Sequence, residues 1–71
     1  MKKAFIVEAG KYDMEGDESI SYSSVSMTGI KEAVADVKSC LSYPWVRLVV
    51  LIDGKEVQTF DRYTLAMLDL I

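Results

Sequence analysis

The sequence predicts an α+β domain, a four-stranded antiparallel sheet of β-β-α-β-β order with one amphipathic helix packed on one face. Three observations predict it. Alternating apolar residues, the pattern of half-buried strands, occur towards both ends of the chain. A stretch with helical periodicity lies between them, and an Asp-Gly dipeptide, typical of a two-residue hairpin turn, follows the third strand. The 71 residues form one small domain, residues 1–71, because a second core needs a longer chain.

The first part of the chain predicts two strands joined by an acidic loop. Lys3–Ala9 alternates between apolar faces, residues 10–18 hold two glycines and four acids, and residues 19–27 form a serine-rich second strand. The apolar parity of this second strand changes halfway along. Since an alternating strand changes phase only by gaining a residue, we expect a β-bulge near Ser23 and Ser24.

The middle of the chain predicts the helix. On a helical wheel, residues 29–42 place six apolar side chains inside one arc about 120° wide: Ile30, Ala33, Val34, Val37, Cys40 and Leu41. Thr28 is the expected N-cap, and Glu32 favours the positive end of the helix dipole. Because Pro44 disfavours helical backbone at Tyr43, the helix is expected to end there or just before.

The following residues predict a second hairpin. Val46–Ile52 and Lys55–Asp61 are strands joined by an Asp53-Gly54 turn, a register in which Arg47 faces Phe60. One face of this hairpin is nearly all apolar and should meet the helix: Val46, Leu48, Val50, Ile52, Val57 and Thr59. The opposite face mixes large apolar with polar groups: Trp45, Arg47, Val49, Leu51, Glu56, Gln58 and Phe60.

The tail, Arg62–Ile71, favours a short helix by propensity, with Asp61 or Thr64 as its cap. None of its faces is polar, so other elements must cover it. The expected strand order in the sheet is 2-1-3-4, with the long helix on one face.

The composition excludes most enzyme classes. The chain has no His and no Asn, which removes the common nucleophilic triads, imidazole metal ligands and the usual general base near neutral pH. The single cysteine, Cys40, cannot form an internal disulfide and is expected at the edge of the core. No apolar run approaches the roughly 20 residues of a membrane helix, and none follows Met1 that would make a signal peptide. We therefore expect a cytoplasmic non-enzyme with no cofactor, no metal and no membrane partner.

The net charge of −3 comes from one short segment of the chain. Four of the eleven acids lie in one stretch, and without them 8 basic residues face 7 acidic ones, so the chain has no basic stripe for nucleic acid. Counted from Asp13, the stretch has glycine at position four, where an EF-hand calcium loop needs it at position six, and Ser24 at position twelve, where that loop needs glutamate. It could instead steer a basic protein surface or mimic nucleic-acid phosphates. The candidate binding residues in it are Asp13, Glu15, Asp17 and Glu18.

The mixed face of the second hairpin is the second candidate site. Trp and Arg dominate protein interfaces, because a large amphipathic side chain desolvates much area at little entropic cost. The candidate residues are Trp45, Arg47, Val49, Leu51 and Phe60. In the alternative interpretation, residues 65–71 fold back over this face and make it a second layer of core.

The element order and the hairpin Val46–Val57 resemble small early proteins of tailed phages, among them an antitoxin that blocks a host ribonuclease toxin and inhibitors of host RNA polymerase. The resemblance implies a tiny non-enzyme that binds one bacterial host protein, such as a defence or toxin nuclease or RNA polymerase, and inhibits it by occlusion. The alternative is a self-associating structural protein, a homodimer or larger ring built through the sheet face and the tail.

Overall fold

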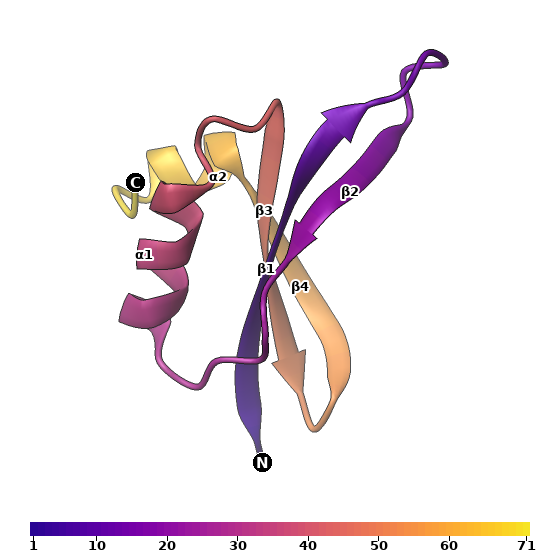
Figure 1. Cartoon of the computed structure of the whole chain (residues 1–71). Coiled ribbons are helices and arrows are strands. Elements are labelled where there is room, and N and C mark those ends of the chain that lie inside the picture. The colour runs from indigo at the N-terminus through magenta and orange to yellow at the C-terminus, as the bar shows by residue number, and fades with distance from the viewer.

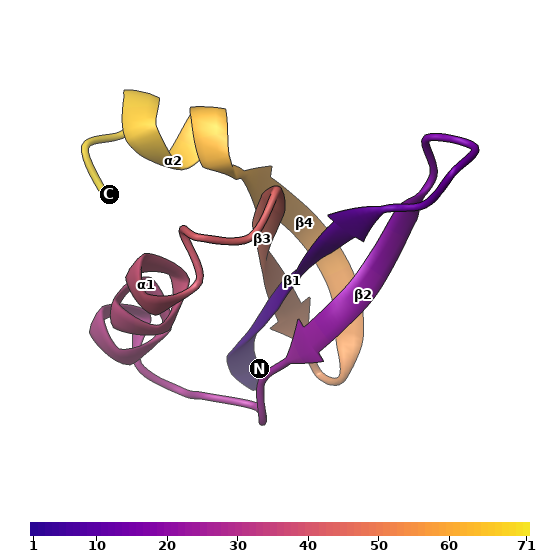
Figure 2. The same cartoon turned by 45° about the horizontal axis from the view of Figure 1, so that its top comes forward.

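The computed structural model describes residues 1–71, and it has the predicted α+β architecture. The elements are β1 (Lys3–Tyr12), β2 (Glu18–Ser23), α1 (Ile30–Ser39), β3 (Trp45–Ile52), β4 (Lys55–Asp61) and α2 (Arg62–Met67). The strands form one antiparallel sheet in the order β2-β1-β3-β4, as expected. Both helices lie on the same side of this sheet (Figures 1 and 2), so its other side, the open face, has no covering element. Neither helix is long and apolar enough to cross a membrane.

The core lies between the helices and the sheet. Its buried members come from β1, α1, β3 and α2: Phe5, Val7, Ala9, Ala33, Val37, Cys40, Val46, Leu48, Val50 and Leu65. Leu70 and Ile71 pack against the same cluster. The tail therefore covers the helix side of the sheet and leaves the face that carries Trp45 and Arg47 open.

The predicted register of the second hairpin is wrong beyond its turn. Ile52 pairs with Lys55 as expected, and the turn residues Asp53 and Gly54 have the positive φ that a type I′ turn requires. Between the next two pairs β4 gains one residue, Val57. This bulge reverses the faces of everything that follows it.

The bulge moves Phe60 to the helix side, opposite Leu48, where it packs against the core. Gln58 moves with it, while Thr59 turns to the open face beside Val49. Covering a phenylalanine in a core stabilises the fold by about 1.5–3 kcal/mol, which outweighs a locally disrupted ladder. The cost is an exposed Val57.

The expected bulge in the second strand lies earlier than predicted. Ala9 pairs with Tyr22 and Gly10 with Ile20, so Ser21 is the extra residue, two positions before Ser23. A Cβ atom on Gly10 would lie 1.9 Å from the carbonyl oxygen of Ser19, so the close approach requires glycine.

The strand itself ends at Ser23 rather than at Met27, which makes only an isolated bridge to Phe5. In the hairpin, β1 extends beyond the predicted Ala9 to Tyr12, so the connecting loop shortens to residues 13–17. The hairpin therefore projects from the sheet as an arm with the acidic loop at its tip (Figure 1).

Helix α1 is shorter than predicted at both ends. Gly29, not Thr28, is its N-cap, and no side chain caps the helix. The carboxylate of Glu32 lies 3.0 Å from the place a Cβ of Gly29 would take, so the small residue leaves room for it. At the other end the Cys40 N–H donates to the Val37 carbonyl, which tightens the last turn and ends the helix at Ser39.

Helix α2 confirms the predicted short helix in the tail. It is capped by Asp61, whose side chain accepts a hydrogen bond of 2.8 Å from the backbone N–H of Thr64. Leu65 points into the core and is completely buried, which fastens the helix over the ends of β3 and β4.

Candidate functional site

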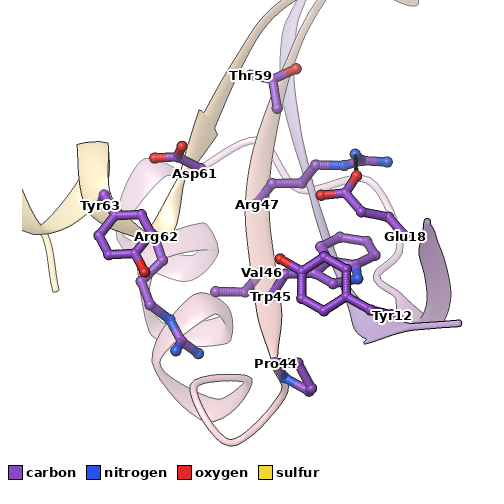
Figure 3. Close-up of a pocket in the computed structure, with 10 residues that line it drawn as sticks. All are labelled: Tyr12, Glu18, Pro44, Trp45, Val46, Arg47, Thr59, Asp61, Arg62 and Tyr63. Atoms are coloured by element: carbon purple, nitrogen blue, oxygen red, sulfur yellow. Dashed lines mark hydrogen bonds and ion pairs between the residues drawn. The ribbon is translucent and has the colours of Figure 1, made fainter. Parts of the chain in front are cut away.

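A cleft of about 280 Å³ lies on the open face, between the arm and the junction of β4 with α2. Figure 3 shows Tyr12, Glu18 and Trp45 on one side of β3, and Asp61 and Tyr63 on the other. The lining residues are Tyr12, Glu18, Pro44, Trp45, Val46, Arg47, Thr59, Asp61, Arg62 and Tyr63. Its charged lining residues are two acids, Glu18 and Asp61, and two arginines, Arg47 and Arg62. We call this the acidic cleft because the carboxylate of Asp61 has no ion pair and the acidic loop lies beside it.

Trp45 is a fixed part of the cleft. Its side chain is only 6% exposed, although no element covers this face. The indole N–H donates a hydrogen bond of 3.0 Å to the Lys11 carbonyl, and the guanidinium of Arg47 lies 4.9 Å from the ring centroid. The tryptophan therefore joins the arm to β3, and most of its surface is already used within the chain.

Arg47 is held on the same side of the cleft by two carboxylates. Its Nε lies 2.8 Å from Glu8 Oε1, and its Nη1 lies 3.1 Å from Glu18 Oε1. One guanidinium thus faces two acids, Glu8 on the neighbouring β1 and Glu18 on β2 beyond it. Because the pairs are partly exposed, each contributes at most about 1 kcal/mol to stability, but together they set the direction of the arginine.

Asp61 supplies a further negative charge from β4. The hydrogen bonds at the start of α2, with that from Thr64 foremost, hold the pKa of Asp61 below its usual value, so it is ionised at neutral pH. It forms no ion pair, since Arg47 turns towards Glu18. The second cation of the lining, Arg62, donates to the carbonyl oxygens of Leu41 and Tyr43 and holds that loop against α2.

Two exposed tyrosines flank the cleft. Tyr12 is half exposed at the end of β1, and Tyr63 is 77% exposed in the first turn of α2. Neither hydroxyl forms a hydrogen bond within the chain. Such aromatic side chains offer both apolar area and a hydrogen-bonding group to a partner, and their rings attract cations.

The acidic loop lies beside the cleft at the tip of the arm. Its backbone is closed by the Asp13 carboxylate, which accepts hydrogen bonds of 2.9 Å from the backbone N–H groups of Glu15 and Asp17. The chain's ion pairs all involve Arg47, so these three loop carboxylates are unpaired. No three His, Cys, Asp or Glu side chains are grouped as a metal site would require.

The structure brings together part of the predicted site. Trp45, Arg47 and Glu18 line the cleft, and Val49 and Leu51 continue the same face of β3 below it. Phe60 is the exception, because the bulge at Val57 turns it to the core.

The sequence analysis missed Glu8, Tyr12, Asp61 and Tyr63. No sequence pattern predicts that these four residues, which come from β1, β4 and α2, lie near one cleft. The alternation of β1 did place Glu8 opposite the core face, and Tyr12 directly precedes the acidic loop.

Comparison with protein-family models, with curated proteins and with solved structures finds no match for this chain. The candidate site therefore stands on its geometry and charge.

Proposed function

We propose that the chain is a non-catalytic protein-binding module that covers a basic surface of its partner with the acidic cleft and the acidic loop. The observation that carries this proposal is the cleft on the open face, where Glu18 and the unpaired Asp61 lie between two exposed tyrosines, with the unpaired carboxylates of the acidic loop beside them. Interfaces of this kind combine aromatic anchors with charges that complement those of the partner.

A basic side chain of the partner fits this cleft. A lysine or arginine entering it meets Glu18 on one side and the unpaired Asp61 on the other. The rings of Tyr12 and Tyr63 stand beside the entrance and can stack on its apolar stem or on its cation. The unpaired carboxylates of the loop add long-range attraction, which speeds the encounter with a basic surface.

The open face below the cleft supplies apolar contact. Ile6, Val49 and Leu51 are neighbours on β1 and β3, and no helix covers them. Ile6 and Leu51 are partly exposed, whereas Val49 between them is buried. Antiparallel sheets that face water usually carry polar residues on that side, so an apolar strip here favours an interface.

The finer proposal is that the partner is a bacterial host protein, and that the chain is a phage-type inhibitor acting by occlusion. Nucleases and RNA polymerases bind phosphate backbones with Lys and Arg, so they present basic surfaces. Carboxylates on a projecting arm can occupy such a surface in place of phosphates.

Capture from bacterial lysate tests the proposal. The tagged full chain is expected to retain one stoichiometric partner, and Tyr63→Ala is expected to reduce the captured amount severalfold. Tyr63 is far more exposed than Trp45, so its truncation leaves the fold intact, as circular dichroism can verify. Met67→Ala, an equally exposed position of the same helix, is the matched control and should capture normally. Capture that is equal for all three chains contradicts the proposal.

The same apolar strip also supports the alternative, a homo-oligomer built through the sheet face and the tail. Met67 and Leu68 of the tail are exposed and could extend such an interface. Sedimentation at several concentrations separates the two functions, because the alternative requires an oligomer that Leu51→Glu dissociates. A monomer at high micromolar concentration excludes it.

A further inference from the structure

The helix side of the sheet carries a second concavity, between α1 and β4. It has a volume of about 470 Å³ and is lined by Lys3, Phe5, Thr28, Ile30, Leu48, Val50, Gln58, Phe60 and Leu70. A shallower hollow of about 310 Å³ continues it along α1 and is lined by Ile30, Lys31, Val34, Ala35, Lys38 and Leu70. Ile30 and Leu70 line both hollows, so the two adjoin at these side chains, and together we call them the lysine groove.

The groove exists because one helix is too narrow to cover this sheet. Four strands at about 4.8 Å spacing span about 19 Å, whereas a helix with its side chains is about 10 Å wide. Helix α1 contacts β1 and β3 but not β4, and α2 is only six residues long and covers the ends of β3 and β4. The floor beside α1, with Val50 and Phe60, is therefore left without a second full-length helix.

The groove is basic, whereas the two acids and two arginines that line the cleft balance each other. The lining of the groove includes Lys3, Lys31 and Lys38 and no acidic residue. None of these lysines forms an ion pair within the chain. An apolar floor with cations around it is complementary to a helix that has an apolar stripe flanked by Asp and Glu.

We propose that the lysine groove binds an acidic amphipathic α-helix of a partner protein, which lies beside α1 and completes the helical layer over β3 and β4. Side chains of the sheet form the floor of the groove and side chains of α1 form its wall. A helix can pack against such a surface. With β4 seven residues long, the site accommodates about three helical turns. Apolar anchors one turn apart would contact Ile30, Val50 and Phe60.

This inference is independent of the acidic cleft. The groove and the cleft lie on opposite faces of the sheet, and the unpaired charges beside them differ in sign: three lysines at the groove, Asp61 and the acidic loop at the cleft. A chain that uses both surfaces can hold two protein segments at once, a basic one on the open face and an acidic one on the helix side.

The test uses the full chain labelled with ¹⁵N and a synthetic three-turn peptide of Leu and Glu, with its leucines at i, i+3, i+4 and i+7. Titration is expected to shift the amide resonances of Ile30, Val50, Gln58, Phe60 and Leu70. The affinity should fall severalfold between about 50 and about 500 mM sodium chloride, because the attraction is between exposed charges. A peptide with Lys in place of every Glu should not bind.

Matched variants locate the site. Ile30→Glu is expected to weaken peptide binding at least about fivefold, a loss of about 1 kcal/mol. Ile30 is 44% exposed, so a charged side chain there does not disturb the core. Ile20→Glu on β2, where the isoleucine is 52% exposed, makes the same change outside the groove and should bind normally.

Each of the following results would overturn the proposal. These are no shift with the acidic peptide, equal shifts with the lysine peptide, shifts confined to the open face, and equal binding by Ile30→Glu and Ile20→Glu. Groove resonances that move with the concentration of the chain alone would show a second copy as the occupant, and would overturn it as well.

Discussion

Arg47 and Asp61 lie directly opposite each other on β3 and β4, yet they form no ion pair. The arginine turns the other way, towards Glu8 and Glu18, and so leaves the Asp61 carboxylate, which caps α2, without an ion pair beside the cleft. The register that makes them neighbours depends on the bulge at Val57. The bulge therefore does two things, because it sends Phe60 to the core and brings Asp61 to the candidate site.

Removal of the bulge residue tests this relationship. Deletion of Val57 removes the bulge but keeps Gln58 opposite Val50 and Phe60 opposite Leu48, so Phe60 is expected to stay on the helix side. Denaturant unfolding should therefore show a loss below about 1.5 kcal/mol, less than the cost of exposing a phenylalanine. The substitution Val57→Thr keeps the bulge at an exposed position and is expected to change stability by no more than about 0.5 kcal/mol. A loss above about 3 kcal/mol for the deletion variant would show that Phe60 does not keep its place opposite Leu48 without the bulge residue.

Trp45 is expected to act through the fold more than through the interface. Trp45→Ala removes a buried side chain and should lower the free energy of unfolding by about 3–5 kcal/mol. Trp45→Phe keeps a ring and loses the hydrogen bond to Lys11, a smaller change of about 0.5–1.5 kcal/mol. Urea denaturation measures both. A loss below about 1 kcal/mol for Trp45→Ala would mean that the indole does not join the arm to β3.

The tail belongs to the core, and Leu65 is its anchor. Leu65→Ala should destabilise the chain by about 2–5 kcal/mol, since the side chain is fully buried between α2 and the sheet. Leu68→Ala, at an exposed position of the same tail, serves as the control and should be nearly neutral. If the two substitutions cost the same, α2 does not pack as described.

Tyr22 and Asp36 link β2 to α1 by a hydrogen bond of 2.7 Å. This bond, followed by burial and the charge of Asp36, raises the pKa of Tyr22 to about 12. A raised pKa means that the folded state holds the phenolic proton more tightly. The linked stability is therefore complete below pH 10, the ordinary tyrosine value, and is lost as the pH rises through 12.

Spectrophotometric titration of the tyrosines checks this assignment. Asp36→Asn should bring the high-pH tyrosine back towards the ordinary pKa of 10.0, and Tyr22→Phe should remove that step from the titration. A titration that Asp36→Asn leaves unchanged would assign the step to another cause.

Much of the fold could be predicted because local patterns determine it. The alternation of Phe5, Val7 and Ala9 and the Asp53-Gly54 turn predicted the strands and their order in the sheet. The helix wheel identified Ala33 and Val37 as buried, although Ile30 and Leu41, on the same half of the arc as Val34, are exposed. Which half of the arc is buried depends on how far the helix covers a twisted sheet, which periodicity does not report.

The two bulges mark where sequence reasoning was weakest. In a regular strand, Val57 at an odd position and Phe60 at an even position point to opposite faces. The same change in the apolar pattern predicted the bulge in the second strand, and here too the structure has a bulge. The bulge was not predicted because the Asp53-Gly54 turn fits a regular two-residue hairpin, and the regular pairing was extended along the whole of β4. The acidic cleft was predicted only in part for a related reason, because Asp61 and Tyr63 reach it through that register and through the position of α2.

The affinity of the captured partner for charge-reversed chains tests the central claim most directly. Glu15→Lys with Asp17→Lys reverses two unpaired loop carboxylates and leaves Asp13, which closes the loop, in place. We predict binding at least about tenfold weaker than that of the unchanged chain, a loss of about 1.4 kcal/mol, and a steeper loss at low salt. Glu32→Lys, an exposed acid on α1, should bind as the unchanged chain does. Equal affinity of the loop variant and the unchanged chain would contradict the proposal that the acidic surface binds the partner.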